Sequence, residues 1–159
     1  MPKQALIMID MQRGLLDSAT PLCTPSAEAP VPACAALTDR CHAAGIPVIY
    51  AVRHYRSDGT DVEKPRAAAW AAGGKPLSED CAAHLSDAFP SAFTVLPQDY
   101  VLVKPRFSAF FHTSLDLILR RLGVQTVLLA GTTTPNCIRT TCYDAISLDY
   151  DAVVLSDCT

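Results

Sequence analysis

Two short segments of the chain, residues 5–9 and residues 126–130, are apolar or β-branched at every position. Strands that expose one face to water alternate apolar and polar residues, whereas strands buried on both faces are apolar throughout. The two segments therefore predict strands of a parallel sheet with helices on both faces. This continuous apolar character limits the chain to the α/β class of folds.

Helix-like and strand-like patterns alternate along the rest of the chain. We expect further strands at residues 46–52, 100–103 and 151–155, and helices at residues 33–44, 78–89, 113–122 and 137–148. Residues 18–32 and 53–75 lack such periodicity; the second is expected to form a pocket rim or lid. Alternation of this kind implies right-handed βαβ units. The predicted fold is a doubly wound three-layer αβα sandwich with a mainly parallel, Rossmann-like sheet.

Length and composition restrict the possible partners. The 159 residues are expected to form one domain, residues 1–159, and the net charge of −3 argues against nucleic acid as the main partner. No apolar run approaches the length of a membrane span and no signal peptide opens the chain, so we expect no membrane partner and a cytoplasmic location.

The seven cysteines contain no CxxC pair and no zinc-like spacing, which indicates reduced thiols.

Cys137 lies where an α/β protein can place a nucleophile. It follows the expected strand at residues 126–130 and a connection that begins at Gly131, and it opens the expected helix at residues 137–148. In the first turn of a helix, free backbone N–H groups and the helix dipole favour a thiolate. Most cysteines are small buried apolar residues, however, and Cys142 leaves a redox pair possible.

Asp10 and Lys104 follow the ends of two other expected strands. In open α/β sheets the ligand site lies beyond the carboxyl ends of the strands. Taken singly, Asp10 could cap a turn and Lys104 could be an ordinary surface lysine. Taken with Cys137, the acid and the cation favour a catalytic site.

Three segments stand in a recognisable order: residues 5–12, residues 103–110 and residues 131–137, with Thr141 and residues 144–145 beyond. Together they resemble the isochorismatase-like cysteine hydrolases, which include nicotinamidases and N-carbamoylsarcosine amidohydrolase. The likeness extends along nearly the whole chain. It implies hydrolysis of a C–N bond in a small amide, imide or carbamoyl substrate through a cysteine thioester, and a homodimer or homotetramer.

The resemblance also assigns residues. Asp10, Lys104 and Cys137 match the catalytic triad of the family position by position. The family further implies a non-proline cis peptide bond between Thr132 and Thr133, which would direct the Thr133 and Cys137 N–H groups at the substrate oxygen.

Metal ligands are expected to be missing. The nicotinamidase branch binds a metal through an Asp-x-His pair after the second strand, where this chain has Arg53 and Tyr55. His54 alone, with the next histidine at His84, makes no ligand set. We therefore expect metal-independent chemistry without a cofactor.

Further residues within or just after these motifs are candidates for contact with a small-molecule substrate. They are Gln12, Arg106, Phe107, Phe110 and His112, with Arg139 as a weaker candidate. Each has a structural alternative: the arginines could form surface ion pairs, the phenylalanines could pack in the core, and His112 could lie at a rim or subunit contact.

Two alternatives remain open. A vinyl-ether hydrolase of the same fold is disfavoured because isochorismatase itself lacks the nucleophilic cysteine. A catalytically silent small-molecule-binding or thiol-redox-sensing protein would use Cys137 and Cys142 without hydrolysis. The chain stops at Thr159, where relatives usually continue into a further helix. Either a C-terminal part is disordered or missing from this sequence, or the C-terminus is short and the last strand is expected to be covered by a subunit contact.

Overall fold

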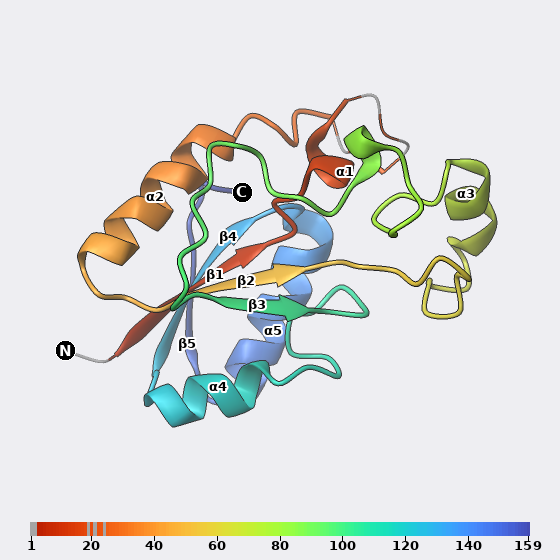
Figure 1. The fold of residues 1–159 in the computed structure, drawn as a ribbon. Coiled ribbons are helices and arrows are strands. Elements are labelled where there is room, and N and C mark those ends of the chain that lie inside the picture. The colour runs from red at the N-terminus through yellow and green to blue at the C-terminus, as the bar shows by residue number, and fades with distance from the viewer. Residues whose placement is uncertain (1–2, 19, 21, 24) are drawn as a thin grey trace.

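The computed structural model describes residues 3–18, 20, 22–23 and 25–159. Its centre is a five-stranded sheet in the order β3-β2-β1-β4-β5 (Figure 1). The strands are β1 (Gln4–Ile9), β2 (Val48–Val52), β3 (Tyr100–Val103), β4 (Thr126–Gly131) and β5 (Asp151–Val154). All neighbouring strands pair in parallel, so the predicted α/β fold is confirmed and the sheet is wholly parallel.

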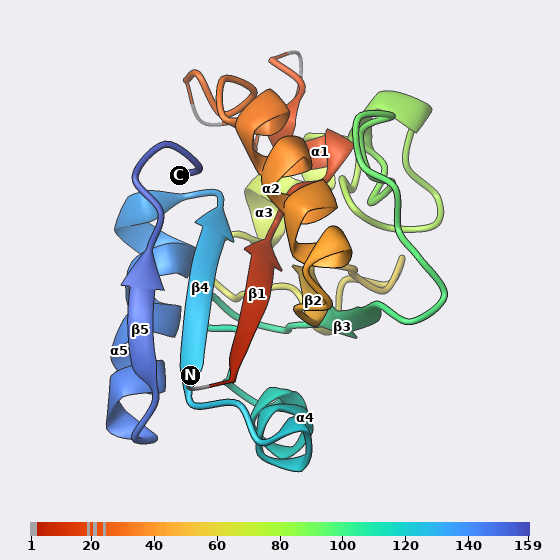
Figure 2. The same cartoon turned by 90° about the vertical axis from the view of Figure 1, so that its left-hand side faces the viewer.

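Helices cover both faces of the sheet (Figure 2). They are α1 (Arg13–Leu16), α2 (Val31–Ala43), α3 (Ala67–Ala72), α4 (Leu115–Leu122) and α5 (Arg139–Ser147), with the 3₁₀ turn η1 (Ala83–Leu85) and the π-helical turn η2 (Thr134–Ile138). Among the described residues, no helix is long and apolar enough to cross a membrane.

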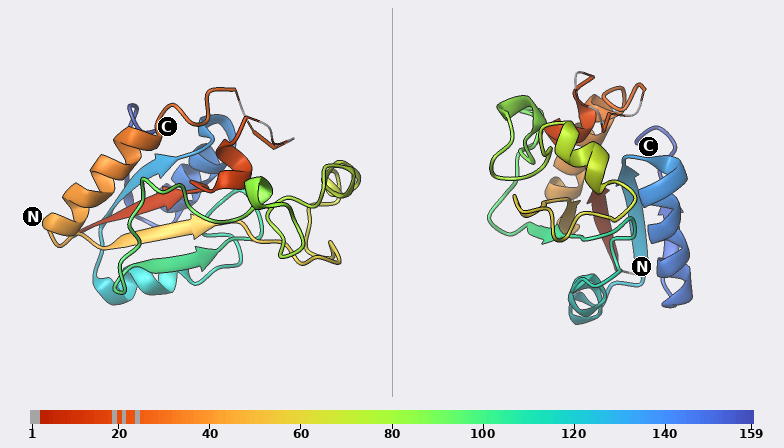
Figure 3. Two further views of the ribbon diagram at one scale, coloured as in Figure 1. Left: turned by 45° about the horizontal axis from the view of Figure 1, so that its top comes forward. Right: turned by 90° about the vertical axis from the view of Figure 1, so that its right-hand side faces the viewer.

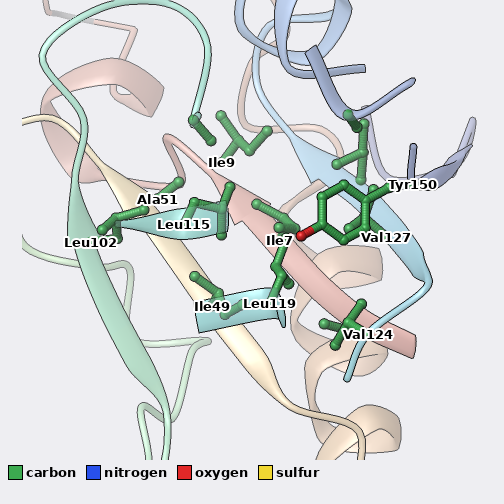
Figure 4. Close-up of a cluster of buried hydrophobic side chains, with 14 of the residues drawn as sticks. Ile7, Ile9, Ile49, Ala51, Leu102, Leu115, Leu119, Val124, Val127 and Tyr150 are labelled. Atoms are coloured by element: carbon green, nitrogen blue, oxygen red, sulfur yellow. The ribbon is translucent and has the colours of Figure 1, made fainter. Parts of the chain in front are cut away.

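Alternate residues of β1 explain the two layers of packing. Leu6 and Met8 point to the face that α2 covers, where they join a core cluster with Cys34. Ile7 and Ile9 point to the opposite face and pack with residues of α4 and α5 (Figure 4). Because both faces are buried, every position of β1 after its first residue is apolar, as the sequence pattern predicted.

Two expectations about helices were wrong. Within the segment predicted to be helical at residues 78–89, only η1 is helical. The Ser78 hydroxyl donates backwards to the Lys75 carbonyl, and Ser78 forms a bridge with Tyr55 instead of capping a helix. Conversely, the predicted irregular segment at residues 53–75 contains α3, an alanine-rich helix whose Trp70 side chain is buried.

The helix predicted to begin at Cys137 also differs. The π-helical turn η2 comes first and contains Cys137, and α5 begins only at Arg139. Cys137 therefore belongs to a widened turn that precedes the regular helix. The other predicted helices and strands match observed elements to within two residues at each end.

The carboxyl edge of the sheet is held by backbone bonds that continue past the strands. The Asp10 N–H donates to the Ala51 carbonyl at 2.9 Å, and the Lys104 N–H donates to the Val52 carbonyl at 2.8 Å. The Thr132 N–H donates to the Ile9 carbonyl at 2.9 Å. These bonds bring the residues that follow three strands to one edge, and α1 and α3 lie beyond that edge (Figure 3).

Gly131 makes the close approach of β4 to β1 possible. Its φ of 113° is unfavourable for other residues, and a Cβ atom there would overlap the backbone of Ile9. The absence of a side chain at Gly131 thus allows the connection before Cys137 to start directly beside Asp10.

Candidate active site

Asp10, Lys104 and Cys137 meet at this edge. The Lys104 Nζ atom lies 2.9 Å from Asp10 Oδ2 and donates to Cys137 Sγ at 3.5 Å. Only 2% of Asp10, 1% of Lys104 and 5% of Cys137 is exposed. The buried ammonium group therefore links the carboxylate to the thiol.

The surroundings of Cys137 disfavour the thiolate, in contrast to the effect expected of a helix start alone. Burial raises the pKa of the Cys137 thiol, and the negative charge of Asp10 raises it further. The charges of Lys104 and Arg53 lower this pKa, but they do not reverse the shift. The physical reason is desolvation: the site removes the sulfur from water, which disfavours the charged form. The site therefore disfavours the charged sulfur, so formation of a thiolate calls for a base.

Arg53 extends the charged cluster beyond Asp10. Its Nε atom lies 3.9 Å from Asp10 Oδ2, and its Nη1 atom donates to the Tyr55 hydroxyl and to a Glu63 carboxylate oxygen. The Tyr55 hydroxyl donates to the other Glu63 oxygen at 2.8 Å. Burial works against ionisation of Glu63, yet the charge of Arg53 and these hydrogen bonds hold the Glu63 pKa below its usual value.

Arg53 and Tyr55 of this cluster occupy the positions at which nicotinamidases are expected to have their metal-binding Asp-x-His pair. Arg53 and Tyr55 are tied to one carboxylate, that of Glu63. Across the part of the chain that the structure describes, no group of three His, Cys, Asp or Glu residues could hold a metal ion.

A small cavity of about 70 Å³ lies above the sulfur. Its lining consists of Asp10, Leu15, Leu22, Arg53, Arg66, Phe107, Thr132, Thr133, Asn136 and Cys137. The peptide bond between Thr132 and Thr133 is cis, at the position that the family resemblance implied. The cavity thus combines a buried thiol, a carboxylate, backbone of the Thr132–Thr133 connection and two guanidinium groups.

Of the predicted substrate contacts, Phe107 lines this cavity and Gln12 does not. The Gln12 side chain is fully buried and bonds both backbone groups of Arg53: its Nε2 donates to the carbonyl and its Oε1 accepts from the N–H, each at 2.7 Å. Gln12 therefore clamps the end of β2 to the segment that follows β1, and it positions Arg53.

The other predicted contacts also lie away from the cavity. Arg106 donates from Nη1 to the carbonyls of Asp61 and Pro105. Phe110 stacks on Tyr150 with ring centroids 5.9 Å apart and packs against the core beneath α4 and α5. His112 is exposed beside Phe111, and Arg139 is exposed on α5.

Sequence reasoning missed Arg66, Asn136 and Glu63. Asn136 directly precedes Cys137, so its position next to the predicted nucleophile could have identified it. Arg66 and Glu63 lie in the segment that was predicted to be irregular, where no periodicity indicates which side chains point inward.

Comparisons with known proteins agree with this architecture. The model of the isochorismatase domain family matches residues 4–159. A probable inactive nicotinamidase of Arabidopsis thaliana is 35% identical over 98% of this chain and 79% of its own length. The maleamate amidohydrolase of Pseudomonas putida is 34% identical over 98% of this chain and 71% of its own length.

A solved structure of an isochorismatase family protein from Desulfovibrio vulgaris superposes with a TM-score of 0.91 at 40% identity, covering 99% of this chain and 82% of that one. The match thus includes the carboxyl edge of the sheet as well as its core. With the family model spanning nearly every residue, the chain belongs to the isochorismatase family of hydrolases.

Proposed function

We propose that the protein is a cysteine amidohydrolase that cleaves a C–N bond in a small amide, imide or carbamoyl compound. The observation that supports this most directly is the contact of Lys104 Nζ with both Asp10 and Cys137, beside a cavity that these residues help to line. The relative from Pseudomonas putida is named for amide hydrolysis, which agrees with this proposal.

The first step would be proton transfer from the Cys137 thiol to Asp10. One carboxylate oxygen, Oδ2, contacts Lys104, while Oδ1 has no hydrogen-bond partner among the described residues. Oδ1 is therefore the oxygen available to accept the proton. Because the site disfavours the thiolate, Asp10 acts as the general base, and Lys104 stabilises the sulfur anion as it forms.

Attack of the sulfur on the substrate carbonyl forms the C–S bond and places negative charge on the carbonyl oxygen. We assign its stabilisation to the backbone N–H groups of Thr133 and Cys137. Protonated Asp10 then donates its proton to the leaving nitrogen, the C–N bond breaks, and an amine or ammonia departs. The remaining group is a thioester on Cys137.

Hydrolysis of the thioester would reverse the roles. Asp10 takes a proton from a water molecule, the hydroxide attacks the thioester carbon, and the C–S bond breaks to release a carboxylic acid. The Asp10 proton then returns to the sulfur. In this scheme Arg53 and Glu63 are charged groups that take no part in proton transfer, the neutral Tyr55 hydroxyl donates to Glu63, and no metal or cofactor takes part.

The second candidate is a catalytically silent protein of the same fold. It is favoured by one observation: the Arabidopsis thaliana relative, which is 35% identical, is described as probably inactive. Redox sensing through Cys137 and Cys142 would be one form of this alternative.

A panel of small amides separates the two candidates. Nicotinamide, maleamate, biuret and N-carbamoyl amino acids would be supplied to the purified protein, and ammonia release would be measured. We expect turnover of at least one compound and a loss of roughly 10⁴-fold or more in Cys137→Ala.

Cys142→Ala is the matched control, because Cys142 lies on α5, is partly exposed and does not line the cavity. It should retain turnover. Full activity in Cys137→Ala would refute the proposed mechanism, and a folded protein that hydrolyses no panel member would favour the silent alternative.

A further inference from the structure

Two arginines, Arg53 and Arg66, line the cavity above Cys137 and take no part in the proposed chemical steps. We infer that the substrate is an anion, a short amide or carbamoyl compound that carries a carboxylate, and that Arg66 and Arg53 bind this carboxylate. The inference rests on the proposed function, since it names the substrate class of the same site.

Arg66 is the first observation. It lines the cavity, it is half-buried, and its guanidinium carbon lies 4.9 Å from the centre of the Phe107 ring. Among the described residues, no carboxylate lies within ion-pair distance of Arg66. A guanidinium group stacked on an aromatic ring still presents its N–H groups at its edge, where they suit the two oxygens of a carboxylate.

Arg53 is the second observation. Only 2% of this residue is exposed, and it also lines the cavity. Its Nη1 atom is occupied by Tyr55 and Glu63, and its Nε atom lies near Asp10. Its Nη2 atom is buried without a hydrogen-bond partner among the described residues. A buried donor without an acceptor is unfavourable, and a substrate oxygen would satisfy it.

Phe107 joins the two arginines. Its ring centre lies 5.4 Å from the guanidinium carbon of Arg53 and 4.9 Å from that of Arg66. Both cations therefore lie against the ring of one residue that lines the cavity. A carboxylate there would be close to the reacting sulfur, so the anion has to lie only a few bonds from the scissile C–N bond. The cavity volume of about 70 Å³ sets the same limit on size.

The balance of charge supports an anionic ligand. The site holds three cations, Arg53, Arg66 and Lys104, and two carboxylates, Asp10 and Glu63. With Cys137 as a neutral thiol, one positive charge is left over. A carboxylate would neutralise it, whereas a neutral amide would leave Arg66 partly desolvated and unpaired.

The test compares matched acids and amides. The substrates are succinamate against succinamide, and N-carbamoylglycine against N-carbamoylglycinamide, which differ by the charge of one terminal group. We expect kcat/KM to favour the acid by roughly tenfold to a hundredfold in at least one pair, the factor that a charge-assisted hydrogen bond supplies.

Arg66→Gln should reduce this ratio towards one, mainly through KM of the acid. Arg66→Lys should recover part of the preference by restoring the charge without the planar donor fork. Lys64→Gln is the matched control: it removes a cation from the same segment, but Lys64 is exposed and does not line the cavity, so the ratio should persist. A ratio near one in the wild-type protein, or one that Arg66→Gln leaves intact, would overturn the inference.

Binding to Cys137→Ala keeps this inference separate from the proposed hydrolysis. Calorimetric titration with the same four compounds should show the acid binding more tightly than its amide, and Arg66→Gln should abolish the difference. If the wild-type protein hydrolyses none of the four, this titration alone decides: selective binding of the acids upholds the anion site, and absent or equal binding refutes it. Hydrolysis of the neutral amides alone would uphold the proposed function and refute the anion site.

Discussion

Two regions of the molecule contribute residues to the candidate site, and they are stabilised in different ways. The edge that carries Asp10, Lys104 and Cys137 is part of the parallel sheet, and its backbone bonds extend the strand ladders. The part that carries Arg66 belongs to residues 53–85. Their buried core consists of Tyr55, Val62, Trp70 and Leu77, and Leu15 and Leu22 pack against it. The first region depends on the fold as a whole, whereas the second depends on one local cluster.

The first region carries the residues proposed for catalysis, and the second carries Arg66, which we propose selects the substrate. The proposed nucleophile, base and bridging cation all follow strands of the sheet, so their geometry is shared with any protein that has this sheet edge. Arg66 is placed by a loop segment, which can change without disturbing the sheet. Substitutions in the two regions should therefore have different consequences for stability and for function.

Gly131→Ala should have the largest effect on stability, because Gly131 lies where β4 packs directly against β1. The new Cβ atom would overlap the Ile9 backbone, and φ would have to remain at 113°. We expect a loss of about 4 kcal/mol or more in the free energy of unfolding, measured by urea denaturation. Gly45→Ala is the control: Gly45 also has a positive φ, of 65°, but nothing lies within 4 Å of its Cβ position, so the loss should be about 1 kcal/mol. Equal losses would show that close packing at Gly131 is unimportant.

Trp70→Ala should disrupt the second region and spare the first. Trp70 packs against Tyr55 with ring centroids 6.1 Å apart, and its Nε1 donates to the Pro76 carbonyl at 2.8 Å. Its removal should cost about 3 kcal/mol within residues 53–85. Hydrogen exchange should lose protection in this segment and keep it in β1 and β4. Leu117→Ala, at an exposed leucine of α4, should change neither. Equal loss of protection in the sheet would contradict the independence of the two regions.

The sequence predicted the first region well because its signals are periodic and local. Continuous apolar runs identified β1 and β4, and the polar residue after each strand marked the edge of the sheet. Gly131 closed β4 as expected. These signals did not indicate how deeply Cys137 is buried. Burial raises the pKa of its thiol, whereas a helix start alone would lower it.

The second region could not be predicted because contacts distant in sequence determine it. Ser78 resembles a helix cap, but the Tyr55 N–H donates to the Leu77 carbonyl and draws this segment alongside residue 55. Leu77 has a positive φ of 63°, which no residue preference indicates. For the same reason Arg106, which lies within a recognised motif, was expected in the cavity, whereas Arg66, far from any motif, lines it.

Glu63→Gln tests how the two regions are joined. Glu63 belongs to the second region and holds Arg53, which lies beside Asp10 in the first. We expect a loss of about 2 kcal/mol at pH 7, as for a charge-assisted hydrogen bond. Because the folded-state pKa of Glu63 lies below the usual glutamate value of 4.5, its contribution is present above that pH and is lost as the pH falls further. Urea denaturation should therefore show the difference between wild type and variant shrinking below pH 4.5. A difference that is constant with pH would assign the effect to packing.

Asp10→Asn is tested by a change in reaction rate, the smallest of the expected effects, and would sharpen the description of the sheet edge. The Asp10 charge raises the Cys137 pKa, although less than burial does, while Lys104 and Arg53 lower it. With the carboxylate neutralised, the two cations act unopposed, so the thiolate should form at lower pH. Alkylation by iodoacetamide, followed at the Cys137 peptide by mass spectrometry, should be a few-fold faster at pH 8 than in the wild type. Cys81, partly exposed and outside the cavity, provides the internal control and should react equally in both proteins. Slower alkylation in the variant would mean that Asp10 already removes the thiol proton in the resting protein, and the proposed first step would then be complete before substrate binds.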